Sequence, residues 1–458
     1  MSRAPSPPQT VLIVGGGEFG ACTAEALAEG PYKGNEGLIT VVDRGAEPPA
    51  VDAACSDYNK IRADYADPLY AQAGLECINL WRSDPKWSPF YHECGTVVMA
   101  PSNSSAIEYV REAQQWNVDS GTEGISPMTH GGDIKGLYEP SLRAGSRTGT
   151  FEGLEAYYNP IGGWGASRDS IVAVNARARA LGVQYITGEA ASLLFHSSPS
   201  SSSSGGVRGV RLNDGRTLEA DFVVLACGSW TPKLLPELAL NCLPTGQTVA
   251  TVQLTKEEAK RYAKMPVSMS LDLGVYMFPP NADGIFKVAI HGKGFLAPPP
   301  SSSPSSGLPS LPRTALSPGF KNQQIPPVAL EALISGLRRI HPELAELVEK
   351  RRMGTRVCWY SDRESGDFLF SYHPRHPNLF IAAGDSGHAF KFAPLIGSWI
   401  LAGLSSSLSP EQARVWGWDE AEGRGDGSRG EAKGKKLWRD LDSSEFVAAE
   451  VKGVGAKL

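Results

Sequence analysis

Three glycines near the start of the chain form the pattern G-x-G-x-x-G, with Gly15, Gly17 and Gly20 at its fixed positions. The pattern follows an apolar run at residues 10–14, which predicts a buried strand, and precedes a small-residue stretch that predicts a short helix over residues 21–28. Glycine here lets a pyrophosphate approach the backbone and lie at the positive end of the helix. Asp43 ends a second apolar run and is placed to accept hydrogen bonds from a ribose diol. This unit predicts a dinucleotide site, and it does not decide between FAD and NAD.

A lysine and a cysteine further along the chain are also candidates for chemistry. Lys287 lies in an alternating stretch, where it shares one side with Ile285 and Ala289. A lysine in such a stretch is commonly solvated, but a cation that faces apolar neighbours needs a specific role. Cys358 precedes a tryptophan, and without further information it would be interpreted as an inert, packed thiol.

Other common catalytic signatures do not occur in the sequence. It contains no nucleophile elbow, no H-E-x-x-H and no P-loop. The isolated histidines His130, His341 and His376 lack the spacing of metal ligands. Seven cysteines are scattered without a CxxC pair, and no signal peptide is visible. We therefore expect no metal site and no disulfide framework, and a reducing compartment fits best.

The composition is that of a globular protein. Its 458 residues exceed the about 250 to 300 at which a single core stops growing, which predicts two domains or one elaborated domain. Lys plus Arg number 44 and Asp plus Glu 49, a net charge of -5, without the basic excess that nucleic-acid binding needs. The longest nearly apolar run, residues 392–404, is shorter than the about 18 residues that suggest a membrane span. Neither a nucleic acid nor a membrane is expected as a partner.

The apolar runs that end in small residues indicate how the chain is organised. Residues 10–14, 222–227 and 379–383 are predicted to be strands of one parallel, doubly wound sheet. Because these segments are far apart in the sequence, the second domain must be interleaved between them. Alternating stretches at residues 275–279 and 285–290 suit a mixed sheet that walls off a pocket.

The fold class is therefore α/β: a Rossmann-like nucleotide-binding domain interleaved with an α+β substrate domain built on a mixed sheet. We assign residues 8–90, 150–235 and 356–405 to the first domain and residues 91–149 and 236–355 to the second. Residues 406–458 are expected to form a tail, with the globular fold ending near residue 410.

Low-complexity segments interrupt this plan. Two inserts rich in Ser, Pro and Gly, residues 197–206 and 297–312, are expected to be flexible surface excursions. Within the tail, a charged, Gly-rich stretch at residues 423–436 precedes a short helix expected at residues 437–450.

Five ordered blocks carry a resemblance to a known family. The blocks lie between residues 10 and about 405, and they are G-D-S-G-H-A-F-K at 384–391, F-K-V-A-I-H at 286–291, T-R-V-C-W-Y at 355–360 followed by G-D-F at 366–368, D-Y-N-K-I-R-A-D-Y at 57–65, and residues 222–230. Together they are similar to the D-amino-acid-oxidase superfamily, specifically its sarcosine oxidase branch. Within that branch the chain resembles the fungal saccharopine and pipecolate oxidases and the fructosyl amino acid oxidases.

The chain departs from these relatives at two points. Fructosyl enzymes usually carry an acidic residue soon after the position of Lys287, where this chain has V-A-I-H. This departure argues against a sugar-amine substrate. In addition, one apolar residue is missing between Lys60 and Arg62, which leaves the direction of these two side chains open.

The resemblance implies a role for each matched residue. FAD would be the cofactor, attached covalently through Cys358, and Lys287 would lie over the flavin on the face where oxygen reacts. His291 would lie close to the substrate, with a core histidine bonded to the backbone as the alternative. Arg62 and Lys391 would clamp the substrate carboxylate. For Arg62 the alternative is a surface salt bridge with Asp57 or Asp64.

The fingerprint and the resemblance together predict a cofactor-binding set, in which His388 is expected to pack against the cofactor. The other members of this set are Gly15, Gly17, Phe19, Gly20, Asp43, Arg44, Lys60, Cys358, Asp385, Gly387 and Lys391.

The activity that the resemblance implies is hydride transfer from the α carbon of a neutral secondary or cyclic amino acid to flavin, followed by reoxidation with oxygen to hydrogen peroxide. Such a reaction needs no general base. A fructosyl amino acid oxidase, a dehydrogenase, an imine-forming oxidase of specialised metabolism and a non-catalytic flavin protein remain alternatives. The expected partners are a small-molecule amino acid and oxygen.

The last three residues, Ala456, Lys457 and Leu458, are a variant of the Ser-Lys-Leu peroxisomal address. An oxidase that makes hydrogen peroxide belongs beside catalase. We therefore expect the peroxisomal matrix, reached through the peroxisomal import receptor, and otherwise the cytoplasm.

Overall fold

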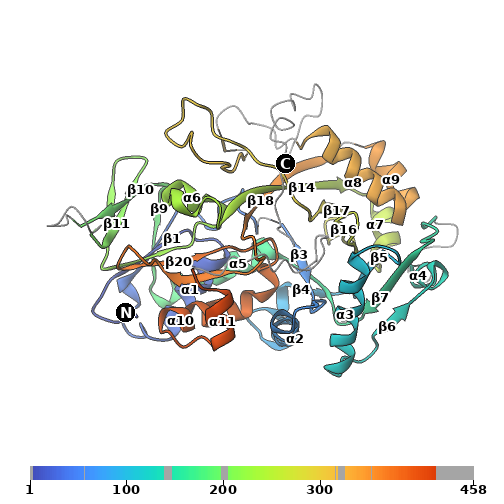
Figure 1. Ribbon diagram of the computed structural model, residues 1–458, viewed down its shortest axis with the longest axis horizontal. Helices are drawn as coiled ribbons and strands as arrows, with labels where there is room; N and C mark the ends of the chain where they lie inside the picture. Colours follow the sequence, from blue (N-terminus) through green and yellow to red (C-terminus); the bar gives the residue numbers. More distant parts are fainter. Residues whose placement is uncertain are drawn as a thin grey trace.

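The apolar run before the glycine fingerprint forms β1 (Val11–Val14), whose four residues are all buried. β1 is the centre of a six-stranded sheet with the order β19-β20-β13-β1-β2-β9 (Figure 1). The pairs from β20 to β9 are parallel, whereas β19 is antiparallel. The other strands are β2 (Ile39–Asp43), β9 (Gln184–Thr187), β13 (Phe222–Leu225), β19 (Leu369–Tyr372) and β20 (Leu379–Ala383). The expectation that three distant segments contribute strands to one parallel sheet is confirmed.

This computed structural model describes residues 4–55, 57–138, 147–196, 205–314, 316–317, 325–351 and 353–418. Most of the insert at 197–206, the Gly-rich stretch, the helix expected at 437–450 and the terminal tripeptide lie outside these residues. Within the described part of the chain, none of the helices has the length and apolar character required to cross a bilayer.

Helix α1 follows β1 and packs against two other helices, α5 and α10. It begins at Glu18, directly after Gly17, so that Gly20 lies in the helix instead of in a preceding turn. The helices associated with the six-stranded sheet are α1 (Glu18–Glu29), α2 (Pro68–Ser83), α5 (Ser167–Leu181), α6 (Thr231–Leu234), α10 (Ala393–Leu404) and α11 (Pro410–Val415).

A second, eight-stranded sheet has the order β18-β14-β17-β16-β15-β5-β7-β6. Its neighbouring strands are antiparallel except for the parallel pair β15 and β5. The strands are β5 (Thr96–Pro101), β6 (Ser126–Met128), β7 (Leu154–Asn159), β14 (Leu243–Gln253), β15 (Val267–Ser270), β16 (Val275–Met277), β17 (Ile285–Ile290) and β18 (Gly354–Asp362). Helices α8 and α9 lie beside one end of β14 in Figure 1. The helices of this part are α3 (Ala106–Asp119), α4 (Gly131–Tyr138), α7 (Lys256–Tyr262), α8 (Pro327–Ile340) and α9 (Pro342–Glu349).

Two three-stranded sheets complete the architecture. One contains β10 (Ala190–Phe195), β11 (Val207–Leu212) and β12 (Thr217–Glu219), and the other contains β3 (Asn59–Ile61), β8 (Gly163–Gly165) and β4 (Tyr91–Glu93).

Two strands lie in a different sheet from the one that the sequence boundaries implied. β7 and β18 fall in segments assigned to the nucleotide domain, but both pair within the eight-stranded sheet. Cys358 on β18, for example, lies opposite Gln247 on β14. Alternating apolar residues identify a strand, but they do not identify its pairing partner, which is decided by long-range register.

The insert at residues 297–312 is exposed over most of residues 300–307, as its composition suggested, but its two ends are anchored in the fold. Ala297 and Ser310 are buried, and the backbone N–H of Ala297 donates to the Ser310 hydroxyl at 3.0 Å. Just beyond the insert, the Arg313 carbonyl oxygen accepts a hydrogen bond of 2.9 Å from the Trp359 indole. The ends of the insert are therefore held in place, and the residue that follows it contacts β18 at Trp359, next to Cys358.

The folded chain also extends beyond the expected end at residue 410. Trp416 is fully buried, its indole N–H donates to the Tyr70 hydroxyl at 3.1 Å, and its ring lies 4.8 Å from that of Trp399. Residues 406–418 thus belong to the nucleotide domain and are not a tail.

Trp416→Ala should lower the free energy of unfolding by about 3–5 kcal/mol, because it removes a large, fully packed side chain. The exposed Arg414→Ala on α11 is the matched control, and its expected effect is below about 0.5 kcal/mol. Urea denaturation followed by tryptophan fluorescence and circular dichroism measures both. Equal effects of the two substitutions would contradict the buried position of Trp416.

Candidate active site

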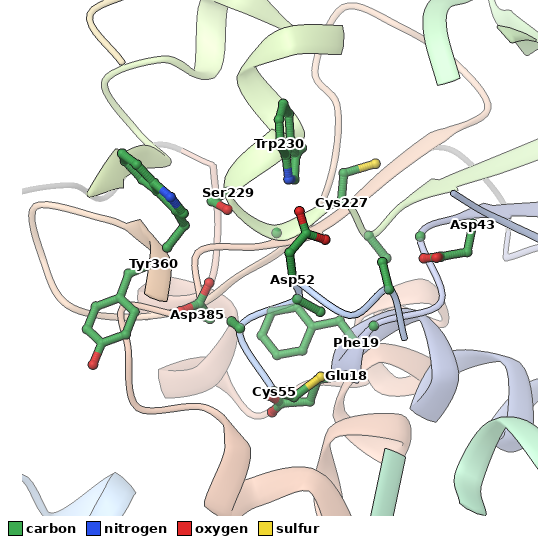
Figure 2. A pocket seen from close by; sticks show the side chains of 18 of the residues that line it. Glu18, Phe19, Asp43, Asp52, Cys55, Cys227, Ser229, Trp230, Tyr360 and Asp385 are labelled. Atoms are coloured by element: carbon green, nitrogen blue, oxygen red, sulfur yellow. The ribbon is translucent and has the colours of Figure 1, made fainter. Parts of the chain in front are cut away.

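A large cavity opens where the strands β1, β2 and β13 end, and it contains about 1520 Å³ of empty space, its mouth included. Val14, Val42 and Ala226 line it at the carboxyl ends of these strands, which is where open α/β sheets bind ligands. Figure 2 shows Asp43 at one end, Tyr360 at the other, and Trp230 opposite Glu18. The predicted cofactor residues that line it are Gly15, Gly17, Phe19, Asp43, Arg44, Lys60, Cys358, Asp385, Gly387 and Lys391.

The glycine fingerprint has the close contacts that its residue types predicted. At Gly15, with φ of +107°, an added Cβ would lie 2.4 Å from the Ala226 carbonyl oxygen. At Gly20 it would lie 1.8 Å from the Gly15 carbonyl oxygen, so Gly20 supports the turn from behind the cavity. At Gly17 an added Cβ would meet nothing within 4 Å. The backbone there faces open space at the start of α1, which fits a pyrophosphate group.

Asp43 uses its carboxylate to hold the turns around it. Its oxygens accept hydrogen bonds from the backbone N–H groups of Gly16 at 2.8 Å and Gly45 at 2.7 Å. Burial raises its pKa, and these two hydrogen bonds oppose the rise. Each carboxylate oxygen can accept a further bond, so the side chain can still bind a ribose hydroxyl. Arg44 contacts Asp52 at 2.6 Å and the Trp230 ring at 4.7 Å.

A smaller cavity adjoins the first and contains about 370 Å³ of empty space. Four residues line both cavities: Lys60, Gly387, His388 and Lys391. The lining of the smaller cavity among the described residues includes Arg62, Lys391, Lys60 and His291 and no aspartate or glutamate. Its electrostatic character therefore suits an anionic group.

Two cations of this smaller cavity are fixed by hydrogen bonds. Lys391 donates to the Tyr65 hydroxyl at 2.7 Å and to the His388 carbonyl oxygen. Arg62 donates to the Asp64 carbonyl oxygen and to the Tyr109 hydroxyl at 3.1 Å. Its Nε atom is buried without a hydrogen-bond partner among the described residues.

The alternative of a surface salt bridge for Arg62 is wrong. Only 4% of Arg62 is exposed, and the Asp64 carboxylate accepts hydrogen bonds from other side chains. These donors are Thr96, Tyr157 and Asn159.

Lys60 and Arg62 line the same small cavity despite the missing residue between them. Residues two apart in an extended segment share a side, so the shorter spacing keeps the two cations together. The Lys60 ammonium lies 3.2 Å from the centre of the Tyr276 ring. Burial lowers the pKa of Lys60 well below its ordinary value, and the charges of Arg62 and Lys391 lower it further.

Lys287 is almost completely buried and is paired with a carboxylate. Its ammonium donates to Asp57 Oδ1 at 2.8 Å and to the Tyr58 carbonyl oxygen at 2.6 Å. Arg356 donates to the other Asp57 oxygen at 2.7 Å. Burial opposes the charge on Asp57, but Arg356 and Lys287 outweigh it and hold its pKa below the usual value. Lys287 itself does not line either cavity described above.

Cys358 lies on the wall of the large cavity, two residues after Arg356 on β18. Burial raises the pKa of its thiol, and the Arg356 charge counteracts this rise. Cys55, which was not singled out in the sequence, lines the same cavity.

The two histidines near the small cavity contact different groups. His291 lines this cavity, and its Nδ1 lies 3.4 Å from the Tyr360 hydroxyl. His388 is held on both sides, because Nδ1 lies 2.9 Å from the Tyr65 hydroxyl and Nε2 lies 2.8 Å from the Gly366 carbonyl oxygen.

Comparison with known proteins identifies this arrangement. Residues 10–402 match the family described as FAD dependent oxidoreductase. This chain belongs to that family. It is 31% identical to L-saccharopine oxidase of Schizosaccharomyces pombe over 422 residues, which cover 90% of this chain and 93% of that protein. It is 22% identical to monomeric sarcosine oxidase of a Bacillus species over 422 residues, which cover 88% and 94%.

The fold of a solved family member agrees with the architecture. Fructosyl peptide oxidase from E. terrenum superposes with a TM-score of 0.78 at 27% identity, over 95% of this chain and 97% of that one. The expected membership of the sarcosine oxidase branch, whose enzymes oxidise amines at a carbon–nitrogen bond with FAD, is confirmed. This chain is a flavoprotein oxidase, and the glycine fingerprint and Asp43, which line the large cavity, are the residues that would hold the dinucleotide part of FAD.

Several residues of this FAD oxidase were missed as site residues. Asp57 stood in a matched block, but its role as the common partner of two cations depends on β17 and β18, which flank β14, both reaching the loop before β3. Arg356 could have been recognised from the sequence, because it lies two residues before Cys358 and residues two apart in a strand share a side. Glu18 could also have been recognised, because an acidic residue inside the glycine fingerprint would place a negative charge beside the negative pyrophosphate.

A group outside the two cavities has the composition of a metal site. Ligand atoms of Glu237, His373 and His376 lie within 4.8 Å of one another. However, Nδ1 of His373 accepts hydrogen bonds from the backbone N–H groups of Arg375 and His376 at 3.1 Å. The neutral ring then carries its proton on Nε2, directed toward Glu237 at 3.3 Å. His373 thus uses Nδ1 for the backbone, while its Nε2 approaches Glu237 without a hydrogen bond among the described residues.

Asp57→Asn should lower the free energy of unfolding by about 3–5 kcal/mol near pH 7, because it leaves two buried cations without their counter-charge. Since the cations lower the folded-state pKa, the stabilisation is complete above the ordinary aspartate pKa of about 4 and is lost as the pH falls through the lower folded value. Urea denaturation across this pH range measures the effect. Asp272→Asn, which removes the more exposed pair with Arg339, is the control, with an expected cost below about 1 kcal/mol. Equal losses would contradict the assigned role.

Proposed function

We propose that this enzyme oxidises the carbon–nitrogen bond of a secondary or cyclic amino acid of the saccharopine, pipecolate or sarcosine kind. The observation that carries the proposal is the small cavity that adjoins the FAD cavity and presents Arg62 and Lys391 without an acidic lining residue among those described. A free carboxylate matches these two cations, because an arginine fork binds it in a bidentate way and a lysine adds a point charge.

The side chains bind and orient the substrate, and bound FAD supplies a two-electron acceptor that oxygen can reoxidise to give hydrogen peroxide. Arg62 and Lys391 hold the carboxylate at the boundary between the cavities, where Lys391 and His388 line both. This position directs the α carbon toward the large cavity. The apolar lining of the small cavity, Met269, Leu271, Val275 and Tyr276, excludes water and accepts the rest of the substrate.

Lys287 is proposed to promote the reaction with oxygen. A fixed cation stabilises negative charge that develops on oxygen, and the effect is strongest where water is excluded. Asp57 orients the ammonium and supplies one negative charge against the two cations Lys287 and Arg356, so the cluster keeps a net positive charge. His291 is proposed to contact the substrate beside Tyr360.

A fructosyl amino acid substrate is the first alternative, and it is favoured by the similarity to a fructosyl peptide oxidase. The chain lacks the acidic residue after Lys287 that resembling enzymes use, and Val288 occupies the next position. An imine-forming oxidase of specialised metabolism is the second alternative. Anaerobic bleaching of the flavin by saccharopine, L-pipecolate, sarcosine and a fructosyl amino acid separates these functions. Bleaching by the fructosyl compound alone would overturn the proposal.

Lys391→Met and Lys287→Met should affect different half-reactions. Loss of a carboxylate partner should raise the substrate concentration for half-maximal anaerobic flavin reduction by about 10- to 100-fold in Lys391→Met. Loss of the buried Lys287 cation should instead slow reoxidation by oxygen by about 100-fold or more in Lys287→Met. Stopped-flow absorbance measures each step separately, so that each variant is the control for the other. Identical effects on both steps would contradict the separate roles.

FAD is proposed to be attached covalently through Cys358. Flavin absorbance should remain with the protein pellet after acid precipitation of the wild-type enzyme, and Cys358→Ala should release it into the supernatant. Cys55→Ala, which changes another of the three thiols that line the same cavity, is the matched control and should keep the flavin in the pellet. Flavin in the wild-type supernatant would contradict a covalent bond, while the noncovalent FAD enzyme would remain. The peroxisomal matrix stays a prediction of the terminal tripeptide.

A further inference from the structure

Glu18 is an acidic residue inside the glycine fingerprint, between Gly17 and Phe19, and it is the first residue of α1. Its side chain lines the FAD cavity, and Figure 2 shows it beside Cys55, on the side opposite Trp230. The same helix terminus presents free backbone N–H groups toward the cavity, where the pyrophosphate of a dinucleotide binds. An acid and a pyrophosphate therefore compete for one positive helix end.

The carboxyl group of Glu18 is not neutralised by a neighbour. Its Oε1 atom is buried and has no hydrogen-bond partner among the described residues. The charged groups that act on it are Asp385, which disfavours its ionisation, and Lys391, whose ammonium is bonded to Tyr65 and His388. The thiols of Cys22 and Cys55 also face it. Among the described residues, Lys391 is the positive charge that favours ionisation of Glu18, but its ammonium is bonded to Tyr65 and His388.

Ionised Glu18 would oppose FAD binding for two reasons. FAD brings two negative phosphate charges to the same end of α1, and like charges at close range repel strongly where water is excluded. In addition, FAD would displace the water that solvates the carboxylate. Burial already raises the pKa of Glu18 well above its ordinary value, and Asp385 adds to this rise. A bound cofactor raises it further.

We propose that Glu18 binds FAD as a neutral carboxylic acid that donates a hydrogen bond to an oxygen of the ribityl pyrophosphate chain. A protonated carboxyl group is a donor as well as an acceptor, so it turns a repulsive contact into an attractive one. FAD binding is then coupled to uptake of one proton. This assignment rests on the FAD-binding family and is independent of the amine substrate.

The coupling sets the direction of the pH dependence. Because the carboxyl pKa is higher with FAD bound than without, binding has its full strength below the pKa of the free site. Above that value the dissociation constant of FAD should rise by about tenfold per pH unit, until the pH passes the pKa of the complex. The measurement uses the apoprotein in the Cys358→Ala background, so that FAD exchanges freely. Flavin fluorescence titration between about pH 6 and pH 9 gives the dissociation constant, and calorimetry in two buffers of different ionisation enthalpy gives the proton uptake.

Glu18→Gln distinguishes the role of this carboxyl group from other titrations. The amide keeps a hydrogen-bond donor and cannot ionise, so FAD should bind within about threefold of the parent at low pH, without the pH slope and without proton uptake. Glu29→Gln, which changes an exposed acid of the same helix, is the matched control and should keep both.

Two results would overturn the proposal: a parent protein whose FAD affinity does not change with pH and takes up no proton, or a Glu18→Gln variant that keeps the parent's slope. If Glu18→Gln does not fold, Glu18→Ser is the second neutral variant and is judged by the same slope. Because no amine is used, failure here leaves the substrate proposal unaffected.

Discussion

The Asp57 carboxylate joins three parts of the chain at one point. It binds Lys287 from β17 and Arg356 from β18, and it precedes β3, which carries Lys60 into the site. These bonds attach the eight-stranded sheet to the loop that borders the FAD cavity. Burial of a single unpaired charge would cost several kcal/mol, so each of the three charges requires the other two. The relative position of Cys358, Lys287 and Lys60 depends on this requirement.

Charge is distributed unequally between the two adjoining cavities. The large cavity is lined by five acids, Glu18, Asp43, Asp52, Glu189 and Asp385, as well as by cations. The small cavity has cations and histidines but no acid among its described lining residues. An anionic cofactor in the large cavity would therefore depend on backbone N–H groups, on close approach at the glycines and on neutralised acids. An anionic substrate in the small cavity would instead contact side-chain cations directly. Under the proposed function, this difference allows two neighbouring sites to bind two different anions.

The strongest sequence predictions concern local chemistry. The glycine fingerprint, β1 and Asp43 are close in sequence, so residue types and spacing are sufficient to place them. Lys391 and His388 were recognised within one continuous block, and the structure brings both to the boundary between the cavities. In contrast, the sheet that contains β7 and β18 was assigned wrongly, because side-chain alternation is the same whichever partner a strand has. The end of the fold was also wrong, since Trp416 is buried only by residues distant in sequence, such as Tyr70.

The sequence by itself determined the family, the parallel sheet and the residue types of the site, because these are encoded in short segments. Only the tertiary structure decided which charges meet. The pairing of Lys287 with Asp57, the burial of Arg62 against Tyr109 and the unpartnered oxygen of Glu18 depend on contacts between residues that lie on separate elements. Charge interactions depend steeply on distance and burial, and distances between remote segments are set by how the two large sheets pack.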